Sequence, residues 1–93
     1  MELIATVGRS PSCDLVVSAS PYVSRKHAEL LKEGSGFILQ DESTNGTRVN
    51  GQSLGKHEFI NIYQGDEVYF STEGPFFFRI SPDGAPTFTG FAA

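Results

Sequence analysis

Short runs of β-branched and aromatic residues alternate with turn-forming residues along the whole chain. In the run at residues 58–62, Ile60 and Ile62 alternate with Phe59 and Asn61, which is the two-residue period of a half-buried strand. No stretch keeps a helical period over three turns. We expect strands at residues 3–7, 14–17, 27–32, 37–40, 47–49, 58–62, 67–71 and 76–81.

Turn signals such as Ser10-Pro11, Asn45-Gly46 and Asn50-Gly51 separate these runs. Residues 25–33 are the best helical candidate, but their flanks favour the first arm of a hairpin whose second arm is 37–41. Many short strands between Gly and Pro turns predict an all-β protein, a sandwich or a barrel. We expect one domain over residues 1–81 and an extended tail or the start of a linker over 82–93, where Gly84, Pro86 and Gly90 recur.

The charge of the chain restricts its partners. The net charge of −4 argues against a nucleic-acid binder with a broad basic face. Between Gly8 and His27, however, the sequence has three basic residues and one acidic residue. From Ala28 onward it has nine acidic and four basic residues. A small cationic spot on an acidic body suits a compact anionic ligand, although chance clustering of surface cations explains the charges alone equally well.

The chain has one cysteine, Cys13, which excludes an internal disulfide framework and favours a cytoplasmic protein. No apolar run approaches the roughly 20 residues of a membrane helix. The first six residues lack the basic start and long apolar stretch of a signal peptide. We therefore expect neither membrane nor nucleic acid among the partners.

Glycine, asparagine and hydroxyl residues concentrate in three short stretches at expected strand ends. These are Gly8-Arg9-Ser10, Ser24-Arg25-Lys26-His27 and Ser43-Thr44-Asn45-Gly46-Thr47. Loops at one end of a sandwich converge, so distant residues can share a site. Their guanidinium, ammonium, hydroxyl and turn N–H groups fit a doubly ionised phosphate, which has three acceptor oxygens.

These three stretches, in this order and spacing, are similar to the signature of forkhead-associated (FHA) domains. The flanks agree: Ser12 to Val17 looks like the strand after the arginine, and Gly65-Asp66-Glu67-Val68 like a late turn of the family. The resemblance covers roughly residues 3–80. It implies a β-sandwich of two twisted, mainly antiparallel sheets that docks phosphothreonine and needs no cofactor or metal.

The resemblance also implies a role for individual residues in the phosphopeptide site. Arg9, Ser24 and Thr44 would contact the phosphate, Arg25 would supply further donors, and Asn45 would hold the main chain of the ligand. Lys26 would add charge, but its direction depends on strand register. The residue three positions after the phosphothreonine would tune specificity, read by loops near Tyr22 and around residues 49–52.

Other motif residues are better explained as scaffold. The resemblance implies that His27 is buried and braces the loop of Ser24. Gly46 and Gly51 follow Asn45 and Asn50 and are expected to supply positive φ at turns. Gly8 is expected to allow close backbone approach beside Arg9. Asp14 and Asp41 are expected to accept hydrogen bonds in loops.

The sequence departs from the family at its start, because only seven residues precede Gly8. A first strand that normally pairs with the last one would be missing, which would expose an edge beside residues 76–80. Either the tail, with Phe88 and Phe91, or a second copy of the chain would cover that edge. The chain is therefore a monomer or a weak dimer in this interpretation.

Two other functions compete with a phosphothreonine module in kinase-linked signalling. A phospho-independent interaction domain of the same fold is disfavoured, because Arg9, Ser24, Thr44 and Asn45 are all present. An enzyme is disfavoured because Cys13 has no histidine near it in sequence, His27 and His57 have no metal-ligand spacing, and a nucleotide-binding glycine loop is lacking.

Overall fold

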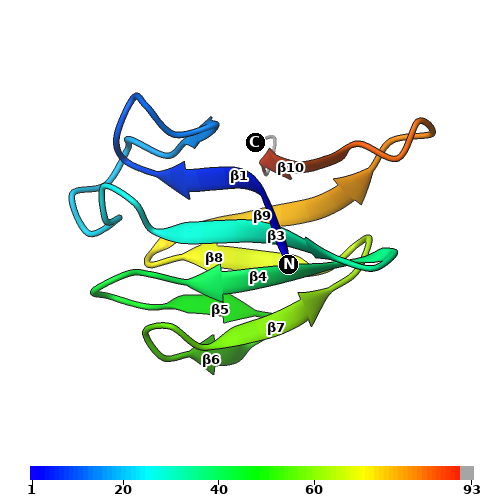
Figure 1. Cartoon of the computed structure of the whole chain (residues 1–93). Helices are drawn as coiled ribbons and strands as arrows, with labels where there is room; N and C mark the ends of the chain where they lie inside the picture. The colour runs from blue at the N-terminus through cyan, green and yellow to red at the C-terminus, as the bar shows by residue number, and fades with distance from the viewer. Residues whose placement is uncertain (91–93) are drawn as a thin grey trace.

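Two five-stranded sheets form the protein in the computed structural model, which describes residues 1–90. The first sheet has the order β2 (Leu15–Val16), β1 (Glu2–Gly8), β3 (Ala28–Glu33), β4 (Gly36–Asp41) and β7 (Phe59–Ile62). The second has the order β10 (Pro86–Gly90), β9 (Glu73–Ile80), β8 (Glu67–Phe70), β5 (Thr47–Val49) and β6 (Gln52–Leu54). Every pair is antiparallel except β1–β2. The all-β sandwich expected from the sequence is confirmed, and Figure 1 shows the two layers face to face.

The hairpins follow from the turn residues between the strands. The arms β3 and β4 meet at Gly34, which adopts a φ of 59°. Asn50 and Gly51 have φ values of 50° and 83°, as a tight hairpin turn requires, and join β5 to β6. Strand β6 was not expected, because its three residues include only one apolar side chain, although the Asn-Gly turn was the signal for it.

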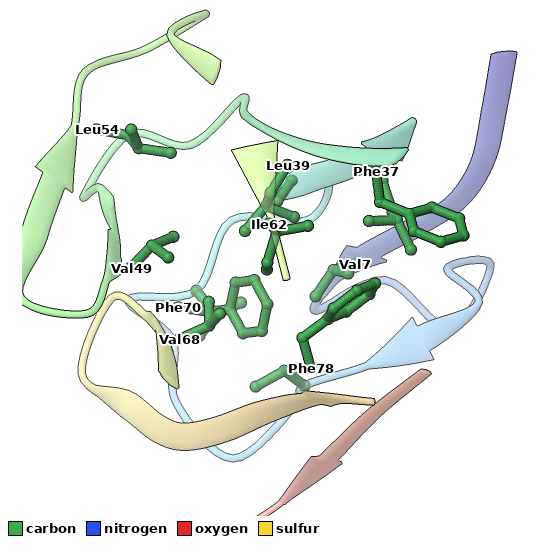
Figure 2. Packing of buried hydrophobic residues seen from close by; sticks show 13 residues of the cluster. Val7, Phe37, Leu39, Val49, Leu54, Ile62, Val68, Phe70 and Phe78 are labelled. Atoms are coloured by element: carbon green, nitrogen blue, oxygen red, sulfur yellow. The ribbon is translucent and has the colours of Figure 1, made fainter. Parts of the chain in front are cut away.

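The core lies between the two sheets and is built by inward side chains of both. Val7, Leu39 and Ile62 come from the first sheet, and Phe70 and Phe78 from the second. Figure 2 shows these side chains pointing toward one another between the layers. The rings of Phe37 and Phe78 meet edge to face at 5.6 Å. Within the Phe76–Phe78 run, Phe78 is fully buried and belongs to this core.

The segment expected to be a tail is a strand as far as Gly90. Pro86–Gly90 pairs with residues 76–80 of β9, and Phe88 lies opposite Phe78. The ring of Phe88 lies 5.3 Å from that of Phe78 and 5.7 Å from that of Phe70. Burial of this ring explains why a segment rich in Gly and Pro orders as a strand.

Strand β10 therefore covers the edge of β9 that the short N-terminus was expected to expose, so the tail version of that expectation is confirmed. Phe91 lies outside the described residues. Where the domain ends stays a prediction.

Replacing Phe88 with alanine tests how much β10 stabilises the sandwich. We expect the free energy of unfolding to fall by about 2–3 kcal/mol, because a half-buried ring and its contacts with Phe70 and Phe78 are lost. Urea denaturation followed by fluorescence or circular dichroism measures it. Thr87→Ala on the exposed face of the same strand should change the value by less than about 0.5 kcal/mol. Equal effects of the two changes would contradict a packed β10.

The loops after β1, before β3 and after β4 gather at one end of the sandwich, at the left of Figure 1, where the loop after β8 also lies. Strand β5 starts at this end and runs away from it for three residues, or about 10 Å. The β5–β6 turn therefore lies toward the opposite end. The part of the chain that the structure describes, residues 1–90, contains no helix of the length and apolar character needed to cross a membrane.

Candidate functional site

Gly8 and Arg9 end β1 and carry the first loop of the site. The carbonyl oxygen of Arg25 lies 2.2 Å from the position that a Cβ on Gly8 would take, so only glycine fits there. This close approach lets the Arg9 N–H donate to the Ser24 carbonyl at 2.9 Å. The Nε of Arg9 donates to the Val23 carbonyl at 2.9 Å, which fixes the direction of an otherwise exposed guanidinium.

His27 joins the second loop to the third. It is fully buried and lies edge-on to the ring of Phe70 at 5.8 Å. Its Nδ1 accepts from the Ser24 N–H at 3.0 Å, so the ring proton is on Nε2, which donates to the Gly46 carbonyl at 2.9 Å. Through these two hydrogen bonds, His27 holds the second and third loops at a fixed separation.

Ser24 is the point at which all three loops meet. Its carbonyl binds the Arg9 N–H, its N–H binds His27, and its Oγ accepts from the Thr44 N–H at 3.0 Å. Because Oγ acts as an acceptor there, its own hydrogen is left to donate to a ligand. The side chain of Thr44 is exposed beside it.

A buried carboxylate organises the third loop from below. Oδ1 of Asp41 accepts from Ser43 Oγ at 2.6 Å, from Thr47 Oγ1 at 2.7 Å and from the Ser43 N–H at 3.2 Å. Ser43 Oγ in turn accepts from the Gly46 N–H at 2.8 Å. Among residues 1–90, the other oxygen, Oδ2, is buried without a hydrogen-bond partner. Asp41 thus anchors both ends of the loop that presents Thr44 and Asn45.

The roles of Ser43 and Thr47 were missed at the level of sequence. Phe37, Leu39 and Asp41 alternate inward along β4, which places the carboxylate on the core side and requires buried donors for it. The spacing Asp41-x-Ser43 is also that of an Asx turn. These two signals together would have indicated the network.

Asn45 is fixed by a contact that the sequence does not reveal. Its Nδ2 donates to the carbonyl of Tyr22 at 2.8 Å, across 23 positions of the chain. The bond holds the third loop against the second and leaves the side-chain oxygen and one N–H of Asn45 at an exposed position.

The remaining expected residues divide into two groups. Arg25 is exposed next to Ser24, whereas Lys26 forms an ion pair with Glu29 at 3.1 Å and so is directed toward β3. Asn50 and Gly51 lie at the opposite end of the sandwich, where Asn50 bonds to Asp66 and to the Glu67 N–H. The expectation that residues 49–52 read a ligand next to the phosphate site is therefore wrong: strands β5 and β6 carry that turn away from it.

Burial lowers the pKa of His27 below its usual value, because desolvation disfavours the imidazolium more than the Gly46 carbonyl and the nearby Asp41 favour it. The unfolded state then binds more protons than the folded state just below pH 6.5, so stability falls as the pH falls through that range. Well above pH 6.5 the ring is neutral in both the folded and the unfolded state, so its titration no longer changes the free energy of unfolding.

We therefore expect the free energy of unfolding to decrease between pH 7 and pH 5.5 and the His27 ring to titrate below 6.5 by NMR. In His27→Gln, which keeps His57, this part of the pH dependence should disappear. A ring that titrates above its usual pKa would contradict the buried neutral brace.

The chain belongs to the FHA domain family, whose family model matches residues 5–71. It is 42% identical over 64 residues to the serine/threonine-protein kinase RAD53 of Saccharomyces cerevisiae, covering 68% of this chain and 8% of the kinase. It is 39% identical over 67 residues to the E3 ubiquitin-protein ligase CHFR of Danio rerio, covering 70% of this chain and 10% of the ligase.

Among solved structures, the N-terminal FHA domain of S. cerevisiae Rad53p in complex with a phosphothreonine peptide matches with a TM-score of 0.69 and 29% identity. The match covers 96% of this chain and 67% of that one. The chain thus spans only a small fraction of the curated relatives, 8% and 10% of their lengths.

Proposed function

We propose that the chain is a phosphopeptide-binding module that docks phosphothreonine of a partner protein at the three-loop end of the sandwich, and that it does not catalyse a reaction. One observation carries the proposal: Ser24 is hydrogen-bonded to Arg9, His27 and Thr44 at once, which joins three distant loops around one hydroxyl whose hydrogen is left to donate. A site assembled in this way, with an exposed guanidinium beside it, suits a small dianion.

In this proposal Arg9 binds the phosphate through its terminal guanidinium nitrogens, since Nε is already bonded to Val23. The Ser24 hydroxyl and the Thr44 side chain donate to the remaining oxygens, and Arg25 adds charge. Asn45 holds the main chain of the ligand through its exposed oxygen and N–H, because its other N–H is bonded to Tyr22. Lys26, paired with Glu29, has a minor part.

The partner belongs, in this proposal, to a pathway run by serine/threonine kinases. The similarity to FHA-containing protein kinases such as RAD53 supports this assignment, as does a neighbour solved with a phosphothreonine peptide. A Glu or Asp in place of the phosphate would supply half the charge and two of three oxygens, so phosphorylation would act as the switch.

A degenerate peptide library with a fixed central phosphothreonine tests the proposal, with the same library carrying threonine as its control. We expect the immobilised chain to retain only phosphorylated peptides. Equal retention of the two libraries, or none of either, would overturn it.

A further inference from the structure

Strand β7 forms an open edge of the first sheet, with β4 on one side only (Figure 1). Alternate residues of a strand inside an antiparallel sheet exchange hydrogen bonds with one neighbour and then with the other. In and just after β4, the Glu42 N–H donates to the His27 carbonyl, next to β3, and the Asp41 N–H donates to the Glu58 carbonyl, next to β7. The odd-numbered residues of β4 therefore bind β7, and the even-numbered ones bind β3.

The register of β4 with β7 then gives the direction of the main-chain groups on β7. Leu39 lies opposite Ile60, so the N–H and carbonyl groups of Ile60 and Ile62 bind β4. The same groups of Phe59 and Asn61 point away from β4, out of the edge of the sheet. Within residues 1–90, these two donors and two acceptors have no hydrogen-bond partner.

The free part of this edge ends at Tyr63. The Tyr63 N–H donates to Asp66 Oδ2 at 2.8 Å, and the Tyr63 carbonyl accepts from the Asp66 N–H at 3.0 Å. A further strand can therefore pair with residues 59–61 but not beyond them.

The edge of β7 also lacks the features that usually protect an edge strand, which are charge, proline and short length. Strand β10 begins at Pro86, which has no N–H, and β2 and β6 span only two and three residues. By contrast, residues 59–63 contain neither a charge nor a proline, and Phe59 and Tyr63 are 58% and 64% exposed. An uncharged aromatic edge with free donors and acceptors indicates a surface for strand pairing.

We propose that a second copy of the chain pairs with this edge, with β7 antiparallel to β7 about a twofold axis at Ile60. In this register Phe59 of each copy exchanges hydrogen bonds with Asn61 of the other, and all the free groups are paired. A twofold axis at Phe59 or at Asn61 would pair only one of the two residues. The edge is thus self-complementary, as a twofold interface requires.

The side chains agree with this register. Ile60 packs against the core but is only partly buried, because no strand flanks it on this side, and it would meet Ile60 of the second copy. Phe59 would lie beside Asn61 of the second copy, with the other Phe59 at the diagonal position. Glu58 would lie opposite Ile62, so two chains of net charge −4 meet without opposed like charges.

Sedimentation equilibrium of the chain without any peptide tests the pairing. We expect the average mass to rise from that of one chain toward that of two as the concentration increases, with a dissociation constant of about 100 µM for so small an interface. A mass that stays at one chain up to about 1 mM would overturn the proposal.

Amide hydrogen exchange measured by NMR tests the position of the contact. The Phe59 and Asn61 amides should exchange rapidly in dilute solution and more slowly as the concentration rises. The Ile60 amide, which is bonded to β4, should be protected at every concentration. Concentration-dependent protection on another strand instead of β7 would contradict the pairing.

Variants then test the register. Phe59→Lys and Asn61→Glu each place a charge at an exposed edge position and should each raise the dissociation constant at least about 10-fold. Mixed in equal amounts, the two variants should associate again, because residue 59 of one copy lies opposite residue 61 of the other. The matched control is Val16→Lys, which adds a cation at the other edge of the same sheet and should leave association unchanged.

These outcomes decide the proposal independently of the proposed function, because every experiment omits the phosphopeptide. Association that survives in both single variants places the contact elsewhere and overturns the pairing. A mixture of the two variants that stays monomeric contradicts the twofold register at Ile60.

Discussion

Replacing Arg9 with alanine should weaken binding of a selected phosphothreonine peptide by about 2–4 kcal/mol, or roughly 30- to 1,000-fold. The loss is large because the phosphate would keep its charge and lose the guanidinium that Val23 holds toward it. Because Arg9 is exposed, the free energy of unfolding should change by less than about 1 kcal/mol. Calorimetric titration and urea denaturation of the same preparation measure both quantities.

Two further variants control this result. Arg79→Ala removes an exposed cation of β9 and should leave the affinity unchanged. Arg9→Lys keeps the charge without the planar fork and should recover only part of the affinity. If Arg9→Ala retains full binding to a partner, the chain is instead a phospho-independent interaction domain of the same fold.

Replacing Gly8 with alanine should destabilise the protein by about 2–3 kcal/mol, as forced overpacking does. The added Cβ would meet the carbonyl oxygen and carbon of Arg25 at 2.2 and 2.8 Å, and these backbone atoms cannot turn away as a side chain can. The loop of Ser24 and Arg25 would have to move away from Arg9. We therefore expect peptide affinity to fall as well, which titration at a temperature where the variant is folded would detect.

Gly36→Ala is the matched control for Gly8→Ala. Its Cβ would lie 3.7 Å from the nearest backbone oxygen, an ordinary contact, and Gly36 has no positive φ. We expect a change of less than about 1 kcal/mol in stability and none in affinity. Unfolding free energies that match between the two alanine variants would contradict the close approach at Gly8.

The sequence predicts those parts of the fold that local pattern determines. Alternation along residues 58–62 indicated which side chains face the core, and Ile62 is 2% exposed while Phe59 is 58% exposed. The Asn-Gly pairs predicted positive φ at Gly46 and Gly51, where it is 95° and 83°. Local pattern did not predict β10, because its stability comes from Phe88 meeting Phe70 and Phe78 rather than from its own composition.

The candidate site, like the fold, could be predicted from the sequence only in part. The motif residues identified the loops, but the contacts between loops depend on tertiary structure. The bonds from Asn45 to the Tyr22 carbonyl and from His27 to the Gly46 carbonyl join residues 23 and 19 positions apart, so no local pattern contains them.

The most direct test is a calorimetric titration of the chain with one library-selected peptide, prepared with phosphothreonine and with plain threonine. We predict a dissociation constant in the micromolar range for the phosphorylated form, about −8 kcal/mol, and no detectable binding of the other. Equal affinities for the two peptides would contradict the account.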